Sequence, residues 1–366
     1  MKFGFMSEGE TAENQSYHHR YMDLVREVQW AEEMGFDFFA SSEQHFTFGA
    51  TISAPECLYS YLFALTKRIR FRHAVTLLPY RINHPLRVAE RIATEDILSG
   101  GRIELGVGRA NTSLIVKAFQ INPEDTRDEV KEGLDIIRLS FTEEPFEFKG
   151  RFFDIPKRYM IPRPIQRPYP PISMAATSPD SMEMAAREGL GAMGSSYFFG
   201  WQWIELLAKT YHDTIKSMDT KPVHANYHFT PLLYAYCADT DEEARKDGYE
   251  GIYNAARLAA IAFSRLAQIS KSYGYMAQAD DIVDKIKDVD WLIEESGTVL
   301  CGSPDTLVRQ IKRYVELGAS EVLIRLDGVS HQKIMRAIEL VGRHVIPQFN
   351  SGFAKVPAGM IKGGFT

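Results

Sequence analysis

The feature that most constrains the fold of this chain is a regular alternation between short apolar runs and longer amphipathic segments. The apolar runs have the length of strands, and the segments after them repeat apolar residues at three- and four-residue spacing, as helices do. The expected strands are Lys2–Met6, Asp37–Ala40, Arg70–Leu77, Ile103–Val107, Ile172–Ala175, Ala192–Ser195, Asn226–Cys237 and Glu321–Arg325. Eight strands separated by helices, with no strong linker between them, favour a closed parallel (β/α)8 TIM barrel over an open doubly wound sheet.

Three segments interrupt this alternation. Pro145–Ile155 alternates like a β-hairpin, and the proline-rich Pro156–Pro171 predicts an irregular wall. Thr240–Glu295 is too long for a single crossover and predicts a helical insertion with helices at Ala255–Ile269 and Asp280–Glu294. All three are expected to lie outside the barrel itself.

The length of 366 residues lies within the range of a single barrel with insertions. We therefore expect one barrel domain over residues 1–348, in which the insertion at about 240–295 is a candidate lid. Residues 349–366 are rich in glycine, lack periodicity and predict a C-terminal tail.

Charge and cysteine content narrow the class of protein. The 42 basic and 48 acidic residues give a net charge of −6, which argues against a general partner of nucleic acid or of acidic membranes and favours small molecules. No apolar run approaches the roughly 18 residues that span a bilayer, and the first ten residues enter a strand directly, so we expect a cytoplasmic protein. Cys57, Cys237 and Cys301 are far apart and odd in number, which predicts core thiols instead of disulfides or a zinc site.

A candidate anion site follows the fourth strand. Arg102–Ala110, RIELGVGRA, runs from a buried strand into Gly106, Gly108 and Arg109. Backbone amides and a guanidinium can meet an anion at such a turn. The arginine can equally pair with a structural carboxylate, and the residues alone leave both interpretations open.

A second candidate anion site follows the fifth strand. Thr177 and Ser178 precede Pro179 at a helix start, where hydroxyls, free amides and the positive end of the helix dipole converge. An ordinary helix cap that binds nothing is the alternative. Because Arg109 lies one strand away on the same expected rim, the pair favours a phosphate.

Histidines supply candidates for proton transfer. His45 lies beside Glu43 and Gln44 at the end of the second strand, and His84 precedes Pro85 and is the more easily explained as structural. The aromatic residues around Tyr197–Trp203 are typical of core packing, although they could also cover a planar cofactor.

Other common sites lack support in the sequence. The run at Gly106 has no third glycine where a Rossmann turn requires one, which disfavours a nicotinamide site. There is no HExxH, paired CxxC or GxSxG motif, so no metal site and no serine hydrolase are expected.

Several stretches together resemble the bacterial luciferase-like flavin monooxygenases. They are KFGF at Lys2, GFDFFASSEQHFTFG at Gly35–Gly49, LLPYRINHPLRVAERIATEDILSGGRIELGVGRA at Leu77–Ala110, AATSPDSMEMAAREGLGAM at Ala175–Met193 and GSPDTLVRQIKRYVELGASEVLI at Gly302–Ile324. The resemblance covers most of the chain and is weakest across Thr240–Glu295. It implies a (β/α)8 barrel, usually dimeric, that uses reduced FMN and O2 to oxygenate a small organic substrate, with the flavin supplied by a separate reductase.

The resemblance also assigns residues. The phosphate positions match Arg109, Thr177, Ser178 and Ser181, and the strand-end backbone against the flavin ring matches Ala74, Val75 and Thr76, where the family often has a non-prolyl cis bond. Asn111 and Thr112 become candidate neighbours of the flavin or of oxygen. The insertion and the proline-rich wall are the expected cover of a dry pocket, which the reaction of reduced flavin with oxygen requires.

The second strand end departs from the family pattern. Glu43 and His45 match the acidic residue and the second histidine of the luciferase Glu-His-His-Phe motif, but Gln44 replaces the first histidine, the one tied to acid–base chemistry. The resemblance therefore does not carry over aldehyde oxidation with light emission. The hypothesis is that His45, helped by Gln44, positions or protonates the peroxide or the substrate.

Three alternatives remain open. The chain could be an oxidoreductase of the same fold that uses a deazaflavin, or a relative that binds flavin without catalysis. It could also be a barrel of another family whose anion site holds a phosphorylated substrate.

Overall fold

A closed ring of parallel strands forms the centre of the computed structural model, which describes residues 1–47 and 50–350. In ring order the strands are β1 (Lys2–Met6), β2 (Phe38–Ser41), β3 (Arg70–His73), β5 (Ile103–Gly108), β8 (Ile172–Ala175), β9 (Gly191–Gly194), β10 (Phe229–Cys237) and β12 (Glu321–Arg325). Pairing of β9 with β10 and of β12 with β1 closes the ring. The expected (β/α)8 TIM barrel is confirmed.

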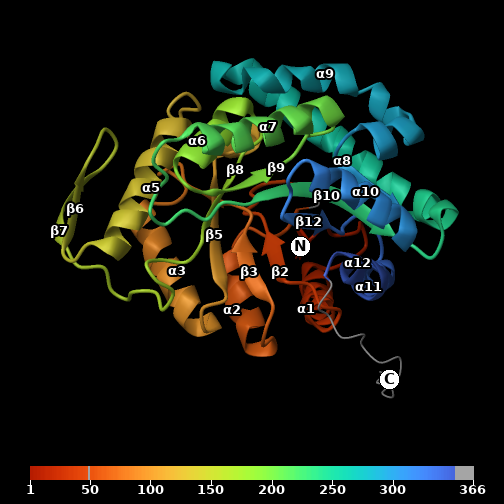
Figure 1. Cartoon of the computed structure of the whole chain (residues 1–366), viewed down its shortest axis with the longest axis horizontal. Helices are drawn as coiled ribbons and strands as arrows, with labels where there is room; N and C mark the ends of the chain where they lie inside the picture. Colours follow the sequence, from red (N-terminus) through yellow and green to blue (C-terminus); the bar gives the residue numbers. More distant parts are fainter. Residues whose placement is uncertain (48–49, 351–366) are drawn as a thin grey trace.

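Helices cover the outside of the ring (Figure 1). They are α1 (Tyr17–Glu33), α2 (Pro55–Leu65), α3 (Pro85–Ser99), α4 (Ser113–Ala118), α5 (Thr126–Thr142), α6 (Pro179–Arg187), α7 (Trp201–Ser217), α10 (Pro304–Glu316), α11 (His331–Leu340) and α12 (Ile346–Phe349). The local signals act as expected at α3, where His84 Nδ1 accepts from the amide of Leu86 and Gly100 ends the helix at φ +68°. His84 is thus a helix cap.

Strand alternation divides the core into two parts. Phe3 and Phe5 of β1 point outward into the large apolar layer between barrel and helices. Met6 points inward, where it meets Phe38, Ala40 and Leu323 in a small cluster at the barrel centre. The inner cluster is small because charged residues fill the rest of the interior.

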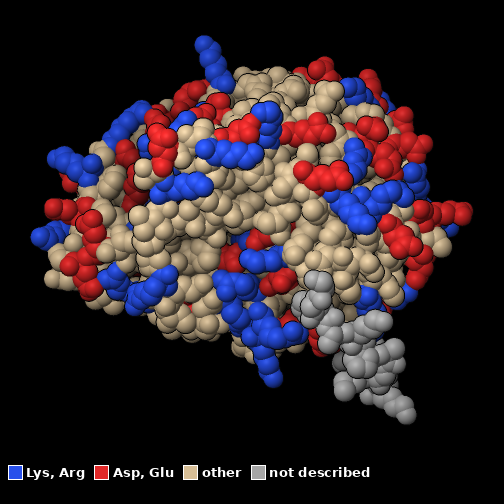
Figure 2. Space-filling view, viewed as in Figure 1, with Lys and Arg blue, Asp and Glu red and all other residues tan. Residues whose placement is uncertain are grey.

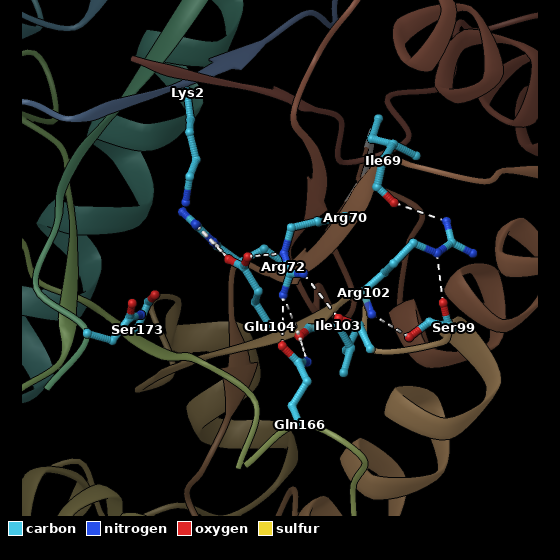
Figure 3. A network of polar contacts seen from close by, with 12 residues as sticks. Lys2, Ile69, Arg70, Arg72, Ser99, Arg102, Ile103, Glu104, Gln166 and Ser173 are labelled. Atoms are coloured by element: carbon cyan, nitrogen blue, oxygen red, sulfur yellow. Dashed lines mark hydrogen bonds and ion pairs between the residues drawn. The ribbon is translucent and has the colours of Figure 1, made fainter. Parts of the chain in front are cut away.

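A buried ion-pair network forms the floor of the barrel, at the N-terminal half of the strands (Figure 3). The guanidinium of Arg72 is 2.7 Å from both Glu104 and Glu321, and its side chain is 1% exposed. The register of β1 on β12 pairs Lys2 with Glu321, and their side chains lie 3.0 Å apart. His228 completes the layer, and burial together with Arg72 lowers its pKa to about 4. His228 is therefore neutral at pH 7.

The expected strand Arg70–Leu77 is interrupted. β3 ends at His73 and β4 (Thr76–Leu77) resumes the line against β5, with a cis peptide bond between Ala74 and Val75. The sequence pattern RFRHAVTL is continuously strand-like and contains no proline, so its periodicity could not reveal the break. The resemblance did predict a cis bond at this strand end.

The sequence missed one short strand. β11 (Val299–Gly302) lies parallel to the end of β10, at Tyr234–Cys237. The run is only four residues long and lies between the insertion and α10, so it was not separated from its neighbours. Two of the cysteines, Cys237 and Cys301, are buried in this pair of strands, whereas Cys57 is exposed and is not a core thiol.

The insertion is helical but its elements differ from the expectation. Its first helix, α8 (Asp241–Ile269), begins much earlier than Ala255, because Thr240 caps it and three acidic residues follow. Gly248 and Gly251 obscured this start, and they are needed because a Cβ would lie 2.7 Å from Tyr236 and from the backbone of Gly328 respectively.

The second expected insertion helix is broken into short pieces. They are η1 (Lys271–Gln278), α9 (Ala279–Ile282), η2 (Lys285–Lys287) and η3 (Trp291–Glu295). η1 and η2 are 3₁₀ turns, which satisfy fewer backbone groups than one continuous helix, so they depend on packing. They lie with α9 against α8, whereas η3, a π-helical turn, packs against β11. The insertion lies across one end of the barrel (Figure 1).

The hairpin expected at Pro145–Ile155 is present. β6 (Phe146–Lys149) and β7 (Asp154–Arg158) form the hairpin, which projects from the body of the protein (Figure 1). Near the C-terminus, η4 (Val341–Val345) runs into α12, and the expected tail lies outside the described residues from position 351 onward.

Surface charge and helix hydropathy complete the description. Acidic and basic side chains are interspersed over most of the face in Figure 2. Within residues 1–47 and 50–350, no helix has both the length and the hydropathy that a membrane span requires.

Candidate functional site

A cavity of about 260 Å³ opens at the C-terminal ends of the barrel strands. Nearly every strand contributes to its wall, and the insertion contributes α8 and η1. In barrels of this kind the strand C-termini carry the chemistry. The cavity is therefore the candidate site.

Most of the residues predicted from the sequence line this cavity. They are Glu43, Gln44, Ala74, Val75, Arg109, Asn111, Thr177 and Ser181, together with Thr112. His45, Thr76 and Ser178 are close in sequence but do not line it. The structure thus brings the ends of four strands, β2, β3, β5 and β8, together at one cavity.

His45 points away from the cavity. Its ring packs against Phe119 with centroids 5.1 Å apart, and its Nε2 lies 3.0 Å from Glu43 Oε1. It can therefore act on the cavity only through Glu43.

Glu43 holds the broken strand end in place. Its buried carboxylate accepts hydrogen bonds from the amide of Leu77 at 2.9 Å and from the side-chain amide of Asn83 at 2.9 and 3.0 Å. Its own amide donates to the carbonyl of Val75. With His45 as a further partner, the carboxylate is saturated, which suits a positioning role.

Gln44 is a hydrogen-bonding group and not an acid. Its side-chain amide donates to Glu8 Oε1 and to Ser42 Oγ, both at 3.2 Å, and Ser42 also donates to Glu8 at 2.8 Å. A carboxamide does not ionise near neutral pH. Gln44 therefore links the second strand end to Glu8 and does no acid–base work.

Gly106 and Gly108 of RIELGVGRA allow β5 to pack closely against the backbone next to the cis peptide bond. A Cβ on Gly106 would lie 1.9 Å from the carbonyl oxygen of His73, and one on Gly108 would lie 2.6 Å from the side chain of Val75. Any side chain at either position would displace Ala74 and Val75, whose backbone faces the cavity. Their first role is therefore to shape this wall.

Arg109 faces the rim with its charge uncompensated. No carboxylate of the described residues lies within 4.0 Å of its guanidinium, which bonds to Ser272 Oγ at 3.2 Å and stacks 4.2 Å from the ring of Tyr273. The alternative of a structural carboxylate partner therefore finds no support in this part of the chain. A half-buried cation without an anionic partner favours an anionic ligand.

The residues at the start of α6 have two different roles. Ser178 and Ser181 form a reciprocal capping box, in which each side chain accepts from the amide of the other. Thr177 instead faces the cavity, where its hydroxyl lies 2.9 Å from the hydroxyl of Tyr275. Ser178 thus acts as an ordinary cap, while Thr177 and Ser181 reach the candidate anion seat.

The insertion supplies residues that the sequence pattern did not identify. Ser272 and Tyr275 of η1 bond to the two predicted anion groups, and the hydroxyl of Tyr273 donates to the carbonyl of Ala110 at 2.8 Å. Burial raises the pKa of Tyr275, so its hydroxyl keeps a proton to donate. The only hint in the sequence was the dense run SYGY within the expected cover.

A second unpredicted group of residues gathers on the opposite side of the cavity. Arg325, at the end of β12, lies 2.9 Å from Glu8, 3.2 Å from Asp327 and 3.5 Å from Glu10. Burial, Asp327 and Glu8 raise the pKa of Glu10 to about 7, against the opposing charge of Arg325. The sequence did hold a signal for this group. The runs MSEGE (residues 6–10) and RLD (residues 325–327) stand at the C-terminal ends of β1 and β12, which are adjacent strands.

The cover of the cavity is apolar, with alanines beside the larger Leu258 and Phe263. Ala255, Ala259, Ala262 and Phe263 of α8 line it at helical spacing. The cavity therefore combines a cationic rim, an acidic side and an apolar roof.

Comparisons with known proteins identify the family of the chain. The family model of luciferase-like monooxygenases matches residues 1–321. The chain belongs to the luciferase-like monooxygenase family, and it is an enzyme of the oxidoreductase class.

Individual relatives span nearly the whole chain. Limonene 1,2-monooxygenase of Rhodococcus erythropolis is 25% identical over 340 residues, which cover 91% of this chain and 81% of that protein. The oxygenase component of the flavin-dependent trigonelline monooxygenase of Acinetobacter baylyi is 22% identical over 360 residues, covering 96% of each. Both relatives are named as monooxygenases, and the trigonelline enzyme is named as flavin-dependent.

Solved structures share the fold. Monooxygenase RslO1 from Streptomyces bottropensis superposes with a TM-score of 0.77 at 25% identity, covering 96% of this chain and 100% of that one. The oxygenating constituent of 3,6-diketocamphane monooxygenase from Pseudomonas putida, solved with FMN, gives 0.73 at 22% identity, covering 95% and 98%. An F420-dependent secondary alcohol dehydrogenase gives 0.73 at 17% identity, covering 95% and 99%.

Proposed function

We propose that this chain is the oxygenase component of a two-component system, which uses reduced FMN and O2 to oxygenate a small organic substrate while a separate reductase supplies the flavin. The observation that carries the proposal is the uncompensated charge of Arg109 beside donor hydroxyls at the rim of the cavity. Reduced FMN supplies two electrons to dioxygen, so that one oxygen atom enters the substrate and the other leaves as water.

The rim fits a phosphate group. Arg109 provides the charge, and the hydroxyls of Thr177, Ser181 and Tyr275 provide donors from three different segments. Hydrogen bonds between a cation and phosphate oxygens are among the strongest polar contacts in proteins. Asn111 lies between the rim and the cavity and would contact the ribityl or ring portion of the flavin.

The wall at the broken strand fits a flat ring. The backbone of Ala74 and Val75 faces the cavity without a bulky side chain, because Gly106 and Gly108 allow β5 to approach closely. Glu43 fixes this wall through Leu77, and His45 orients Glu43. The role proposed for His45 is accordingly indirect, as a positioning residue.

The insertion excludes water. α8 presents alanines to the cavity, and η1 contacts both Arg109 and Thr177, so the two elements together act as a lid over one barrel domain. Exclusion of water strengthens electrostatic contacts inside a site and suppresses side reactions. The apolar lining favours a substrate with a hydrophobic body.

The test is the affinity of Arg109→Ala for FMN, measured by fluorescence titration of the purified protein. Loss of one charge-assisted contact removes about 1.5–3 kcal/mol, or roughly 10- to 150-fold in affinity. Arg127→Ala is the matched control, because Arg127 is a nearby cation that pairs with Asp180 at 3.0 Å; it should weaken binding by less than about threefold. Unchanged affinity in Arg109→Ala would refute the phosphate seat.

The second candidate is an oxidoreductase that uses a deazaflavin, which the shared fold with the alcohol dehydrogenase favours. Titration with both flavins, followed by oxygen consumption with the tighter-binding one in its reduced form, separates the two. Tight FMN binding without product formation across a substrate screen would instead favour a non-catalytic role. The expected homodimer and the cytoplasmic location stay predictions.

A further inference from the structure

Glu10 is a carboxylate of the cavity that the proposed chemistry has not yet used. It follows β1, lines the cavity, and is 31% exposed, compared with 15% for Glu8 and 3% for Asp327. The three carboxylates surround the single guanidinium of Arg325, which is 11% exposed. Glu10 is the most distant of the three, at 3.5 Å, and the most accessible.

Negative charge exceeds positive charge in this cluster. The second cation, Arg20, lies 3.5 Å from Asp327 but forms its shortest contacts with Glu27, at 2.9 Å. Two arginines thus face four carboxylates, those of Glu8, Glu10, Asp327 and Glu27. The excess is therefore two negative charges, and one proton on a carboxyl group halves it.

Within residues 1–47 and 50–350, the other elements around Glu10 bring no further cation. β10 contributes the neutral hydroxyl of Tyr234, which accepts from Arg325 at 3.3 Å. α8 contributes Gly251, Ile252 and Ala255 to the small hollow behind Glu10. His331 contacts Glu27 at 2.8 Å and does not line the cavity. The proton therefore resides on Glu10, whose pKa burial and its acidic neighbours raise to about 7.

We propose that Glu10 is the proton donor and acceptor of this cavity and contacts the oxygen atom of the occupant that gains negative charge. The proton passes from the Glu10 carboxyl to an oxygen of the cavity occupant that gains negative charge, and Arg325 stabilises the carboxylate that remains. Glu10 recovers a proton from water through its exposed edge. The identity of the occupant rests on the proposed function, whereas the protonation of Glu10 does not.

The first experiment measures that protonation without any flavin. Protein labelled with carbon-13 at the glutamate side-chain carboxyl is titrated by NMR, and the Glu10 signal is the one missing from Glu10→Gln. We expect a midpoint near pH 7, well above the ordinary value of 4.5. Glu13→Gln, which removes an exposed carboxyl of the same loop, should leave the Glu10 signal unchanged. A midpoint near the ordinary value overturns the proposal.

The second experiment measures proton transfer to the reaction. Reduced FMN and O2 are mixed with excess protein, and release of hydrogen peroxide is followed across pH. Loss of a general acid typically slows a reaction by about 10²–10⁴-fold, so Glu10→Gln should be at least tenfold slower and lose the inflection near pH 7. Glu10→Asp should keep an inflection at a shifted pH.

The two experiments separate the two proposals. If FMN does not bind but Glu10 titrates near pH 7, the proposed function fails and the assignment of the proton stands. If FMN binds and Glu10→Gln retains both the wild-type rate and its pH dependence, the catalytic part of the Glu10 proposal is wrong. Retention of the rate by Glu13→Gln shows that a loss in Glu10→Gln is specific.

Discussion

The charged floor of the barrel can be tested through Glu321→Gln. Glu321 is 3% exposed and accepts from Arg72 at 2.7 Å, from Lys2 at 3.0 Å and from the hydroxyl of Thr230 at 3.0 Å. Arg72 and Lys2, seen in Figure 3, belong to neighbouring parts of the ring, so the network ties β1, β3 and β12 together below the cavity.

The expected loss of stability in Glu321→Gln depends on the partners that Arg72 keeps. Removal of one partner from a buried ion pair destabilises a protein by about 3–5 kcal/mol, because the other charge stays buried and uncompensated. Arg72 keeps Glu104 at 2.7 Å, although Glu104 is shared with Arg70 at 2.6 Å. The loss in Glu321→Gln should therefore lie at the lower end, at about 3 kcal/mol.

The pH dependence has a definite sign. Burial acts to raise the pKa of Glu321, but Arg72, and to a smaller extent Lys2, hold it well below its ordinary value of 4.5. A carboxyl with a depressed pKa in the folded state contributes stability above its unfolded pKa and loses it as the pH falls below that value. The difference between wild type and Glu321→Gln should be complete at pH 7 and shrink below about pH 4.5.

Urea denaturation followed by tryptophan fluorescence at pH 7 and at about pH 3.5 measures both quantities. Glu90→Gln is the matched control, since Glu90 pairs with Arg87 in the same helix and the two side chains are 39% and 71% exposed. That exposed pair should contribute less than about 1 kcal/mol. The argument is wrong if the two variants are equally stable, or if the deficit of Glu321→Gln is as large in acid as at neutral pH.

Two smaller changes test the contacts around the cavity. Tyr275→Phe removes one hydroxyl from the anion seat and should weaken FMN binding by roughly 3- to 10-fold, the effect of one neutral hydrogen bond; an equal affinity in the titration would show that η1 only covers the seat. His45→Asn should lower the rate of coupled product formation less than tenfold and leave its pH profile unchanged, because His45 contacts Glu43 and not the cavity. Loss of a pH inflection in this variant would restore His45 as an acid or base.

The barrel was predictable because a local sequence pattern encodes each strand and helix, and this pattern repeats along the chain. Each strand of the ring carries the apolar alternation in its own residues, and features such as Pro85 and Gly100 mark helix ends without reference to the rest of the chain. The break at Ala74–Val75 was not visible in this way, since its residues are all compatible with a strand. It depends on the close approach of Gly106 and Gly108, which lie on the neighbouring part of the sheet.

The candidate site was predictable in part for the same reason. Arg109 and Thr177 follow strands, and the C-terminal ends of parallel strands meet at one face, so their convergence follows from topology. Tyr275 and Ser272 are held there by the way the insertion folds back, which no local pattern encodes. Likewise, only the fold could show whether Arg109 has a carboxylate partner.

The departure at Gln44 and the protonation proposed for Glu10 have one electrostatic cause. A histidine at position 44, as in the luciferase motif, would bring a group able to carry positive charge next to Glu8, which Gln44 contacts at 3.2 Å. Gln44 supplies a hydrogen bond but no charge, so only Arg325, together with Arg20 beside Asp327, balances Glu8, Glu10 and Asp327. The excess is then reduced by a proton instead of a cation, and that proton resides on the carboxyl farthest from Arg325. On this argument, acid–base capacity has not been lost with the histidine but has moved from the end of β2 to the end of β1, within the same cavity.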